Sequence, residues 1–179
     1  MTWTIDPAAS RIEFHAHMRL MFVAKVTVVG HFTQFEGTVT GAESDPANAH
    51  VNVTISASSL DTKTDARDKH LRSADFFDVD HYSQLTFTSR HIEALDSTHG
   101  HYRVDGLLAI RDVACEVSMD AWALPQTQGE QRHTVNLTTV LDRRDFGLTW
   151  SSRVQQIADD VQITLYIELV PGSSLPSTD

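Results

Sequence analysis

The sequence predicts an all-β fold, an antiparallel sheet of about eight strands with one short helix in a long connection. Apolar and polar residues alternate with a period of two over most of the chain, as expected where each strand buries one face and exposes the other. The polar face argues against a parallel sheet covered by helices, whose strands are apolar on both faces. Hydrophobic residues make up 41% of the 179 residues, enough for a core.

The alternation marks the strands in order along the chain. The first run covers residues 12–20, and the second covers residues 26–35, with Gly30 as an expected bend or bulge. A turn at Glu36-Gly37 is expected to precede a strand that begins at Thr38. The later runs occupy residues 51–57, 85–88, 104–110, 113–123, 135–141 and 161–169.

One short helix is expected at residues 65–73, within a long connection. Thr62 and Asp65 have the spacing of a capping box, and basic residues near the end, such as Arg72, suit the helix dipole. Residues 142–146 indicate a second, shorter helical turn. We therefore expect one β-barrel domain over residues 1–170 and a flexible C-terminal tail, rich in Ser and Pro, over residues 171–179.

Eight strands in one chain either stack as two sheets or close into a barrel. A sandwich fills its interior with its own side chains, whereas a barrel of eight strands can hold one small ligand. Small residues at inward-facing positions favour a cavity; they are Ala16, Ala57, Gly106, Cys115, Ala121 and Ala123.

Charge and composition narrow the partners. The chain has 14 basic and 24 acidic residues and a formal charge of −10, which disfavours nucleic acid and anionic membrane surfaces. No stretch approaches the ~20 apolar residues of an integral membrane segment. The single cysteine, Cys115, and the lack of a visible signal peptide lead us to expect a cytoplasmic location, with a periplasmic location as the alternative if a leader has been removed. Small molecules and proteins are the expected partners.

Several motifs resemble the YceI family of polyisoprenoid-binding proteins. The stretch Arg67-Asp-Lys-His-Leu-Arg-Ser-Ala-Asp-Phe-Phe77 is the most specific, and Trp3-Thr-Ile-Asp-Pro7, Gly106-Leu-Leu-Ala-Ile110 and Arg144-Asp-Phe-Gly147 occur in the same order as in the family. The resemblance implies an eight-stranded antiparallel lipocalin-like barrel that encloses a polyisoprenoid, an isoprenoid quinone or a fatty chain. It also implies that no cofactor, metal or catalytic residue is required, and the family's tendency to dimerise suggests a homodimer.

The candidate lining of the cavity consists of bulky residues expected to face inward: Phe14, Met18, Val28, Val53, Phe76, Phe77, Leu85, Phe87, Leu108, Val117, Met119, Leu137 and Leu165. Phe76 and Phe77 directly follow the helix, so one is expected to close the end of the barrel and the other to face the ligand. The alternative for each residue is that it simply fills a core.

Three helix residues are candidates for the mouth of the cavity. Arg67, Asp68 and His70 would contact the headgroup of a quinone or an alcohol. Alternatively, Arg67 and Asp68 anchor the connection across the end of the barrel by ion pairing.

The function that we expect is non-catalytic binding, storage or shuttling of a long apolar amphiphile. The alternatives are an enzyme that acts on a lipid or quinone in the same cavity, through His70 or Asp68, and a ligand-free structural or stress-response barrel. No Gly-x-Ser-x-Gly elbow, phosphate-binding loop or zinc helix is present, which argues against an enzyme. Glu13, His15 and His17 share a strand face that could hold a metal, but this is the polar face without supporting partners.

Overall fold

The computed structural model describes residues 2–41, 45–126 and 131–172. Strands dominate these residues, with one α-helix and short 3-10 turns. The strands are β1 (Thr2–Ile5), β2 (Arg11–Leu20), β3 (Ala24–Phe32), β4 (Phe35–Thr40), β5 (His50–Ser56), β6 (Leu60–Asp61), β7 (Gln84–Asp96), β8 (His101–Ile110), β9 (Val113–Ala123), β10 (His133–Asp142) and β11 (Gln155–Pro171). The helix is α1 (Asp65–Arg72), and the 3-10 turns are η1 (Pro46–Asn48), η2 (Ala57–Ser59), η3 (Ser97–His99) and η4 (Arg143–Phe146).

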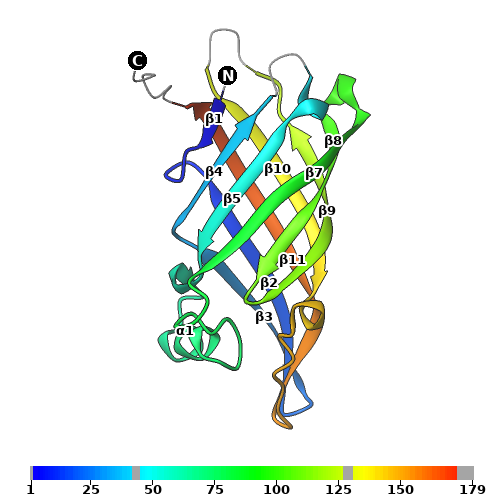
Figure 1. Ribbon diagram of the computed structural model, residues 1–179. Helices are drawn as coiled ribbons and strands as arrows, with labels where there is room; N and C mark the ends of the chain where they lie inside the picture. Colours follow the sequence, from blue (N-terminus) through cyan, green and yellow to red (C-terminus); the bar gives the residue numbers. More distant parts are fainter. Residues whose placement is uncertain (1, 42–44, 127–130, 173–179) are drawn as a thin grey trace.

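The sheet closes into an eight-stranded antiparallel barrel (Figure 1). In ring order the strands are β1, β4, β5, β7, β8, β9, β10 and β11, and the pairing of Trp3 with Pro171 joins β11 back to β1. Strands β2 and β3 extend the barrel wall at two of these positions. β2 pairs with β11, as β1 does, and β3 pairs with β2 in the same way that β4 pairs with β1. The predicted barrel is confirmed, and the sandwich alternative is wrong.

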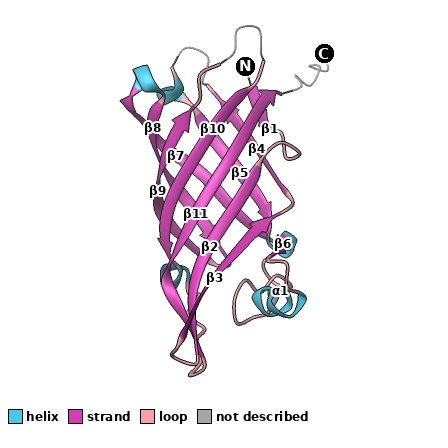
Figure 2. Cartoon of the chain, turned by 180° about the vertical axis from the view of Figure 1, so that it is seen from behind, coloured by secondary structure: helices cyan, strands magenta, loops and turns pink. Residues whose placement is uncertain are grey.

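The two ends of the barrel differ. One end carries α1, the turn between β2 and β3 at residues 21–23, and the connection at residues 143–154; we call it the helix end. The other end carries β1 and the last residues of β11, and we call it the terminal end. Figure 2, seen from behind, shows the same separation, with the β2–β3 hairpin extending beyond the barrel wall.

The predicted strand at residues 26–35 is interrupted. β3 ends at Phe32 and β4 begins at Phe35, so the predicted turn at Glu36-Gly37 is wrong: Gly37 pairs with Val53 inside β4. The predicted bulge at Gly30 is also wrong, because the register between β2 and β3 runs without a shift. Strand β1 was not predicted from the alternation, since four residues are too few to show a period.

Register shifts occur elsewhere in the barrel. One lies in β11 between Ile157 and Val161, and two lie between β7 and β8. An extra residue in one strand increases the local twist and bends the strand. These shifts therefore supply curvature that a closed barrel needs.

The expected helix is present as α1, but its capping differs from the expectation. The N-cap is Thr64, whose side chain forms no capping bond to the helix backbone, so a capping box that begins at Thr62 is wrong. Thr62 is buried and bonded to Asp68 instead. The helical turn expected at residues 142–146 is present as η4, where Asp142 caps the N–H of Arg144. No helix in the described ranges is long and apolar enough to cross a membrane.

The barrel reaches slightly beyond the expected domain boundary. Pro171 still belongs to β11, and the N–H of Gly172 donates to the carbonyl of Thr2 at 2.7 Å. The rest of the expected tail, residues 173–179, lies outside the described residues.

Candidate ligand-binding cavity

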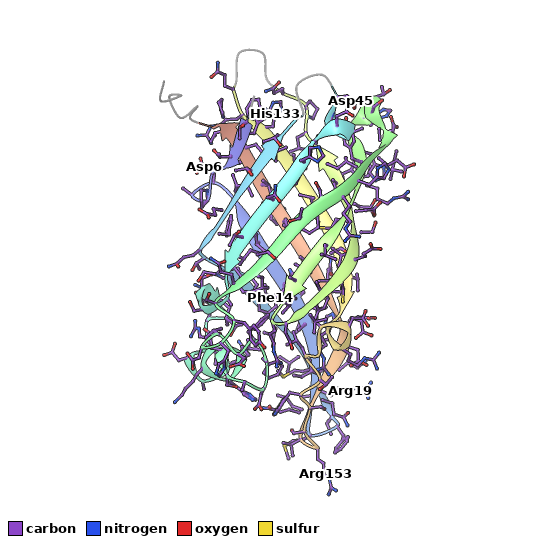
Figure 3. All side chains as sticks on the ribbon, viewed as in Figure 1. Asp6, Phe14, Arg19, Asp45, His133 and Arg153 are labelled. Atoms are coloured by element: carbon purple, nitrogen blue, oxygen red, sulfur yellow. The ribbon has the colours of Figure 1, made fainter. Side chains whose placement is uncertain are left out.

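The barrel contains a cavity of about 1240 Å³. This exceeds the roughly 300–1,000 Å³ of ordinary small-molecule sites. Its wall is apolar over most of its length and draws on strands all round the barrel, from Trp3 and Val39 near the terminal end to Leu20 and Trp150 near the helix end. Figure 3 shows Phe14 in the half of the barrel nearer the helix end.

All thirteen residues of the candidate lining contribute to the wall of this cavity. They do so because side chains on a strand alternate between the two faces. On β9, Met119 and Ala121 are buried, while Asp120 between them and Trp122 after them are exposed. Phe76 and Phe77 both line the cavity, and that one of them closes its end stays a prediction. That these residues bind a ligand is still a prediction.

The small residues divide into two groups. Ala16, Ala121 and Ala123 line the cavity, where a small side chain leaves space. Ala57 is packed in the core, and Cys115 lies beside η4 with its thiol 3.4 Å from the carbonyl of Asp145.

Of the three candidates for the mouth, Arg67 and His70 line the cavity and Asp68 does not. The buried Asp68 carboxylate accepts hydrogen bonds from the N–H and the hydroxyl of Thr62, at 2.9 and 2.5 Å. Arg67 donates through Nε to the hydroxyl oxygen of Thr62 at 2.7 Å and through Nη2 to its carbonyl at 2.9 Å. Both side chains therefore anchor the start of α1, through Thr62 rather than through an ion pair with each other.

An aromatic cluster at the helix end surrounds His70. The edge of its ring meets Trp150 at 4.5 Å and Phe76 at 5.1 Å between centroids, and Phe76 lies 5.5 Å from Trp150. The Nε2 atom of His70 is 2.8 Å from the Asp75 carboxylate. These three rings form the cavity wall between α1 and the connection to β11.

Arg143 is a wall residue that sequence reasoning did not identify. It is 8% exposed and donates to the carbonyls of Ala158 at 3.0 Å, Ile157 at 3.1 Å and Trp150 at 3.2 Å. It also donates to the carbonyl of Leu148 and lies 3.3 Å from the Asp159 carboxylate. These bonds occupy the guanidinium, which therefore fixes the connection and the irregular part of β11 and is not free for a ligand.

Sequence reasoning also missed wall residues that lie outside the long strands. Leu148 and Trp150 lie in a connection without strand periodicity, so no sequence pattern marks them as inward-facing. Trp3 belongs to the short β1. Its ring packs edge-on against His133 at 4.4 Å, and both line the cavity.

Most polar groups of the cavity are found at its two ends, while Glu13 and Thr139 line the wall between them. Arg67, His70 and Gln155 lie at the helix end, while Tyr102 and His133 lie at the terminal end, where Figure 3 labels His133. A long apolar middle with polar ends matches an amphiphile, which needs hydrocarbon contacts along its tail and hydrogen bonds at its head.

The polar strand face considered for a metal has other partners. The Nε2 atom of His15 is 3.1 Å from Glu13, and the Nδ1 atom of His17 is 3.0 Å from the Thr27 hydroxyl on β3. Within residues 2–41, 45–126 and 131–172, no three His, Cys, Asp or Glu side chains gather as a metal site would require. That the protein needs no metal or cofactor stays a prediction.

Comparison with known proteins agrees with this architecture. A model of the YceI-like domain matches residues 3–169. A UPF0312 protein of Shewanella baltica (strain OS185) is 36% identical over 124 residues, which are 68% of this chain and 64% of that protein, so the match spans less than two thirds of it. A UPF0312 protein of Staphylococcus aureus (strain MSSA476) is 29% identical over 157 residues, 86% of this chain and 85% of that protein.

Solved structures show the same fold. BcnA of Burkholderia cenocepacia has a TM-score of 0.77 at 23% identity, over 92% of this chain and 98% of its own. A polyisoprenoid binding domain from Saccharophagus degradans has a TM-score of 0.69 at 16% identity, over 95% of this chain and 98% of its own. The Campylobacter jejuni YCEI protein has a TM-score of 0.69 at 27% identity, over 78% of this chain and 82% of its own. The family model covers the barrel from β1 to β11, and the chain belongs to the YceI-like domain family.

Proposed function

We propose that the protein binds one long apolar amphiphile inside the barrel, and stores or shuttles it without changing it chemically. The ligand class is a polyisoprenoid, an isoprenoid quinone or a fatty chain. The observation that carries this proposal is the long apolar cavity of about 1240 Å³, with polar groups at its ends.

The size of the cavity favours a long chain. A water molecule occupies about 30 Å³ in the liquid and a methylene group has a comparable size, so the cavity has room for on the order of 40 such groups. At roughly 0.3 kcal/mol per heavy atom, a tail of ~15 carbons reaches only millimolar affinity, whereas ~40 carbons approach nanomolar affinity. Chain length therefore decides how tightly the ligand is held.

The helix end is the proposed place for the headgroup. His70 lines the cavity there beside Trp150, and Arg67 lines it with part of its guanidinium bonded to Thr62. Asp68 is occupied by Thr62 and does not reach the cavity, which weakens the hypothesis of an enzyme that uses this carboxylate.

A relative with the same fold supports the ligand class. The Saccharophagus degradans domain is described as polyisoprenoid binding, and it aligns over 95% of this chain. The proposed cytoplasmic location, the proposed homodimer and the proposed absence of a cofactor rest on the sequence and the resemblance. All three stay predictions.

The test is organic extraction of the purified protein followed by mass spectrometry. We expect a long-chain isoprenoid or fatty lipid in a stoichiometric amount, recovered unchanged after incubation with the protein. A protein that carries no lipid, and that takes up neither a hydrophobic probe nor a lipid quinone after delipidation, contradicts the proposal. If the wild type converts the lipid chemically and His70→Ala does not, the hypothesis of an enzyme would be favoured.

Two tryptophan substitutions on β9 separate the cavity from the outer surface. Ala121 lines the cavity and is 3% exposed, whereas Ala114 on the same strand is exposed on the outer face. Ala121→Trp should fill the tunnel and lower ligand occupancy at least tenfold while the barrel stays folded. Ala114→Trp, the matched control, should leave occupancy unchanged, and equal occupancy in both variants would show that the ligand lies elsewhere.

A further inference from the structure

The tip of the β2–β3 hairpin exposes apolar side chains to solvent. Met21, Phe22 and Val23 are 73%, 67% and 88% exposed, and Val154 beside them is 57% exposed. The N–H of Met21 donates to the carbonyl of Val154 at 2.9 Å, so the four residues belong to one surface. We call these four residues the apolar tip. Clustered, protruding apolar side chains of this kind mark contact sites.

The backbone of the apolar tip adds a second, independent observation. Met21 has φ 51° and Phe22 has φ 64°, both in the left-handed region, and the N–H of Val23 donates to the carbonyl of Leu20 at 3.2 Å. A β-turn whose two central residues both have positive φ favours Asn-Gly, and bulky side chains are rare there. The sequence thus places large apolar residues where both solvent and backbone disfavour them.

The charge around the apolar tip opposes that of the whole chain. Arg19, Lys25 and Arg153 are exposed, and none of them forms an ion pair within the part of the chain that the structure describes. Residues 14–35 and 146–158 contain no Asp or Glu, in a chain of formal charge −10. Figure 3 shows Arg19 and Arg153 at this end of the molecule. The acidic average therefore hides a local basic region, and the argument from net charge does not apply to this end of the molecule.

The cavity wall continues into the same hairpin. Met18 and Leu20 on β2, and Val26 on β3, line the cavity a few residues before the turn. Met18 pairs with Val26 in the β2–β3 ladder, so the apolar inner face runs from the barrel toward the apolar tip.

We propose that the apolar tip inserts into the surface of a bilayer that contains anionic phospholipid, with Arg19, Lys25 and Arg153 bound to its headgroups. Apolar side chains surrounded by cations are the pattern that partitions into an anionic interface. A second copy of the chain fits less well, because a symmetric contact would bring like charges together. The proposal rests on the proposed function in one respect: docking at this end would let the ligand pass between bilayer and cavity.

Co-sedimentation with vesicles tests this. We expect binding to mixed phosphatidylcholine and phosphatidylglycerol vesicles, weaker binding to phosphatidylcholine alone, and a decrease with salt. Met21→Asn with Phe22→Gly should weaken binding at least tenfold, since a buried Phe alone gives about that factor. This variant should be at least as stable to heat as the wild type, because Asn-Gly suits the turn.

A charge variant and a control complete the design. Arg19→Gln with Lys25→Gln and Arg153→Gln should weaken binding roughly 100-fold, about fivefold for each cation. Leu95→Asn with Leu124→Asn removes two exposed apolar residues outside the apolar tip and should bind like the wild type. The proposal is overturned if the wild type does not bind, if the Asn-Gly variant binds equally well, or if that variant instead breaks a dimer.

The same preparations separate this inference from the proposed function. If lipid can be extracted from the protein but the protein does not bind vesicles, the docking proposal is contradicted and the proposed ligand binding is not affected. If the protein binds vesicles through the apolar tip but never takes up lipid, the proposed function is contradicted and the docking proposal is supported.

Discussion

Two neighbouring arginines at the end of β10 have different roles. Arg143 points inward and its guanidinium bonds to backbone carbonyls of the connection to β11. Arg144 points outward and pairs with Asp142 at 2.7 Å and with Asp159 at 3.2 Å. A buried cation needs hydrogen bonds to offset its lost hydration, whereas an exposed pair contributes little at neutral pH. Arg143 thus holds the helix end of the barrel together.

The exposed pair gives a prediction for acid pH. The hydrogen bond from the Arg144 side chain, followed by the bond from its backbone N–H, lowers the pKa of Asp142 to about 2. A folded-state pKa below the unfolded value stabilises the protein above pH 3.8, and this stabilisation is lost as the pH falls through about 2. A carboxyl titration by NMR should give Asp142 a midpoint near 2; an ordinary midpoint would contradict the pairing.

The unfolding of Asp142→Asn checks the sign of this effect. Its stability should fall less steeply than that of the wild type between pH 4 and pH 2, because it lacks the carboxyl group that takes up the proton.

At the scale of elements, two aromatic rings cover glycines in neighbouring strands. Phe14 on β2 lies over its partner Gly30 on β3, and Phe87 on β7 lies over Gly106 on β8. Each ring occupies the space where a side chain on the glycine would be, and the absence of that side chain lets the ring lie against the sheet. This arrangement explains why Gly30 sits in a regular strand and not in a bulge.

These glycines should respond differently to replacement by alanine. At Gly30 the three atoms nearest to the new methyl group all belong to the ring of Phe14, which lines the cavity and has space to move into it. At Gly106 it would meet the Phe87 ring and also lie 2.6 Å from the carbonyl oxygen of Thr88, which is backbone. We expect Gly106→Ala to destabilise the barrel by about 1–3 kcal/mol in urea unfolding and Gly30→Ala by less.

A double-mutant cycle checks the cause. Phe14→Leu should relieve most of the effect of Gly30→Ala, whereas Phe87→Leu should leave part of the effect of Gly106→Ala, because the carbonyl stays in place. Similar relief at both sites would contradict the role given to the Thr88 carbonyl.

At the scale of the whole molecule, the closed ring of strands keeps the interior hollow. Apolar residues on the inner faces could in principle have met across the centre, as in a sandwich. Closure through β1 and β11 holds opposite walls apart, and small wall residues such as Ala16 and Ala121 preserve the space. A hollow interior has fewer packing contacts than a filled one, so a bound chain should supply part of the missing stabilisation.

Ligand binding should therefore raise the melting temperature. At a free ligand concentration 100 times Kd, binding stabilises the folded state by about 2.7 kcal/mol. For a chain of this size that corresponds to roughly 5–11 °C. At one fixed free ligand concentration, the gain should increase with chain length up to about 40 carbons, the estimated capacity of the cavity, and then level off. Delipidated protein titrated with isoprenoids of increasing length tests this, and a gain that does not depend on length would argue against occupancy of the tunnel.

Much of the fold followed from the alternation of apolar and polar residues. The long strands showed their period, so Met119, Leu137 and Leu165 could be placed on the inner face. The break at residues 33–34 was missed although the inward-facing positions change there, from the even-numbered Val28 and Phe32 to the odd-numbered Phe35 and Val39. Leu148 and Trp150 line the cavity from a connection whose path depends on Arg143, and no local pattern specifies that path.

By itself the sequence determined the class of fold, the inner face of each long strand and the family, because these depend on local periodicity and on motifs. Only the tertiary structure decided three further properties: that the ring closes through β1, that Asp68 turns away from the cavity to bond Thr62, and that Arg19, Lys25 and Arg153 gather around exposed apolar residues. The first and third depend on which distant segments meet, and that pairing is set by the energy of the whole sheet. The second depends on the path of the connection that leads into α1, which no periodic pattern specifies.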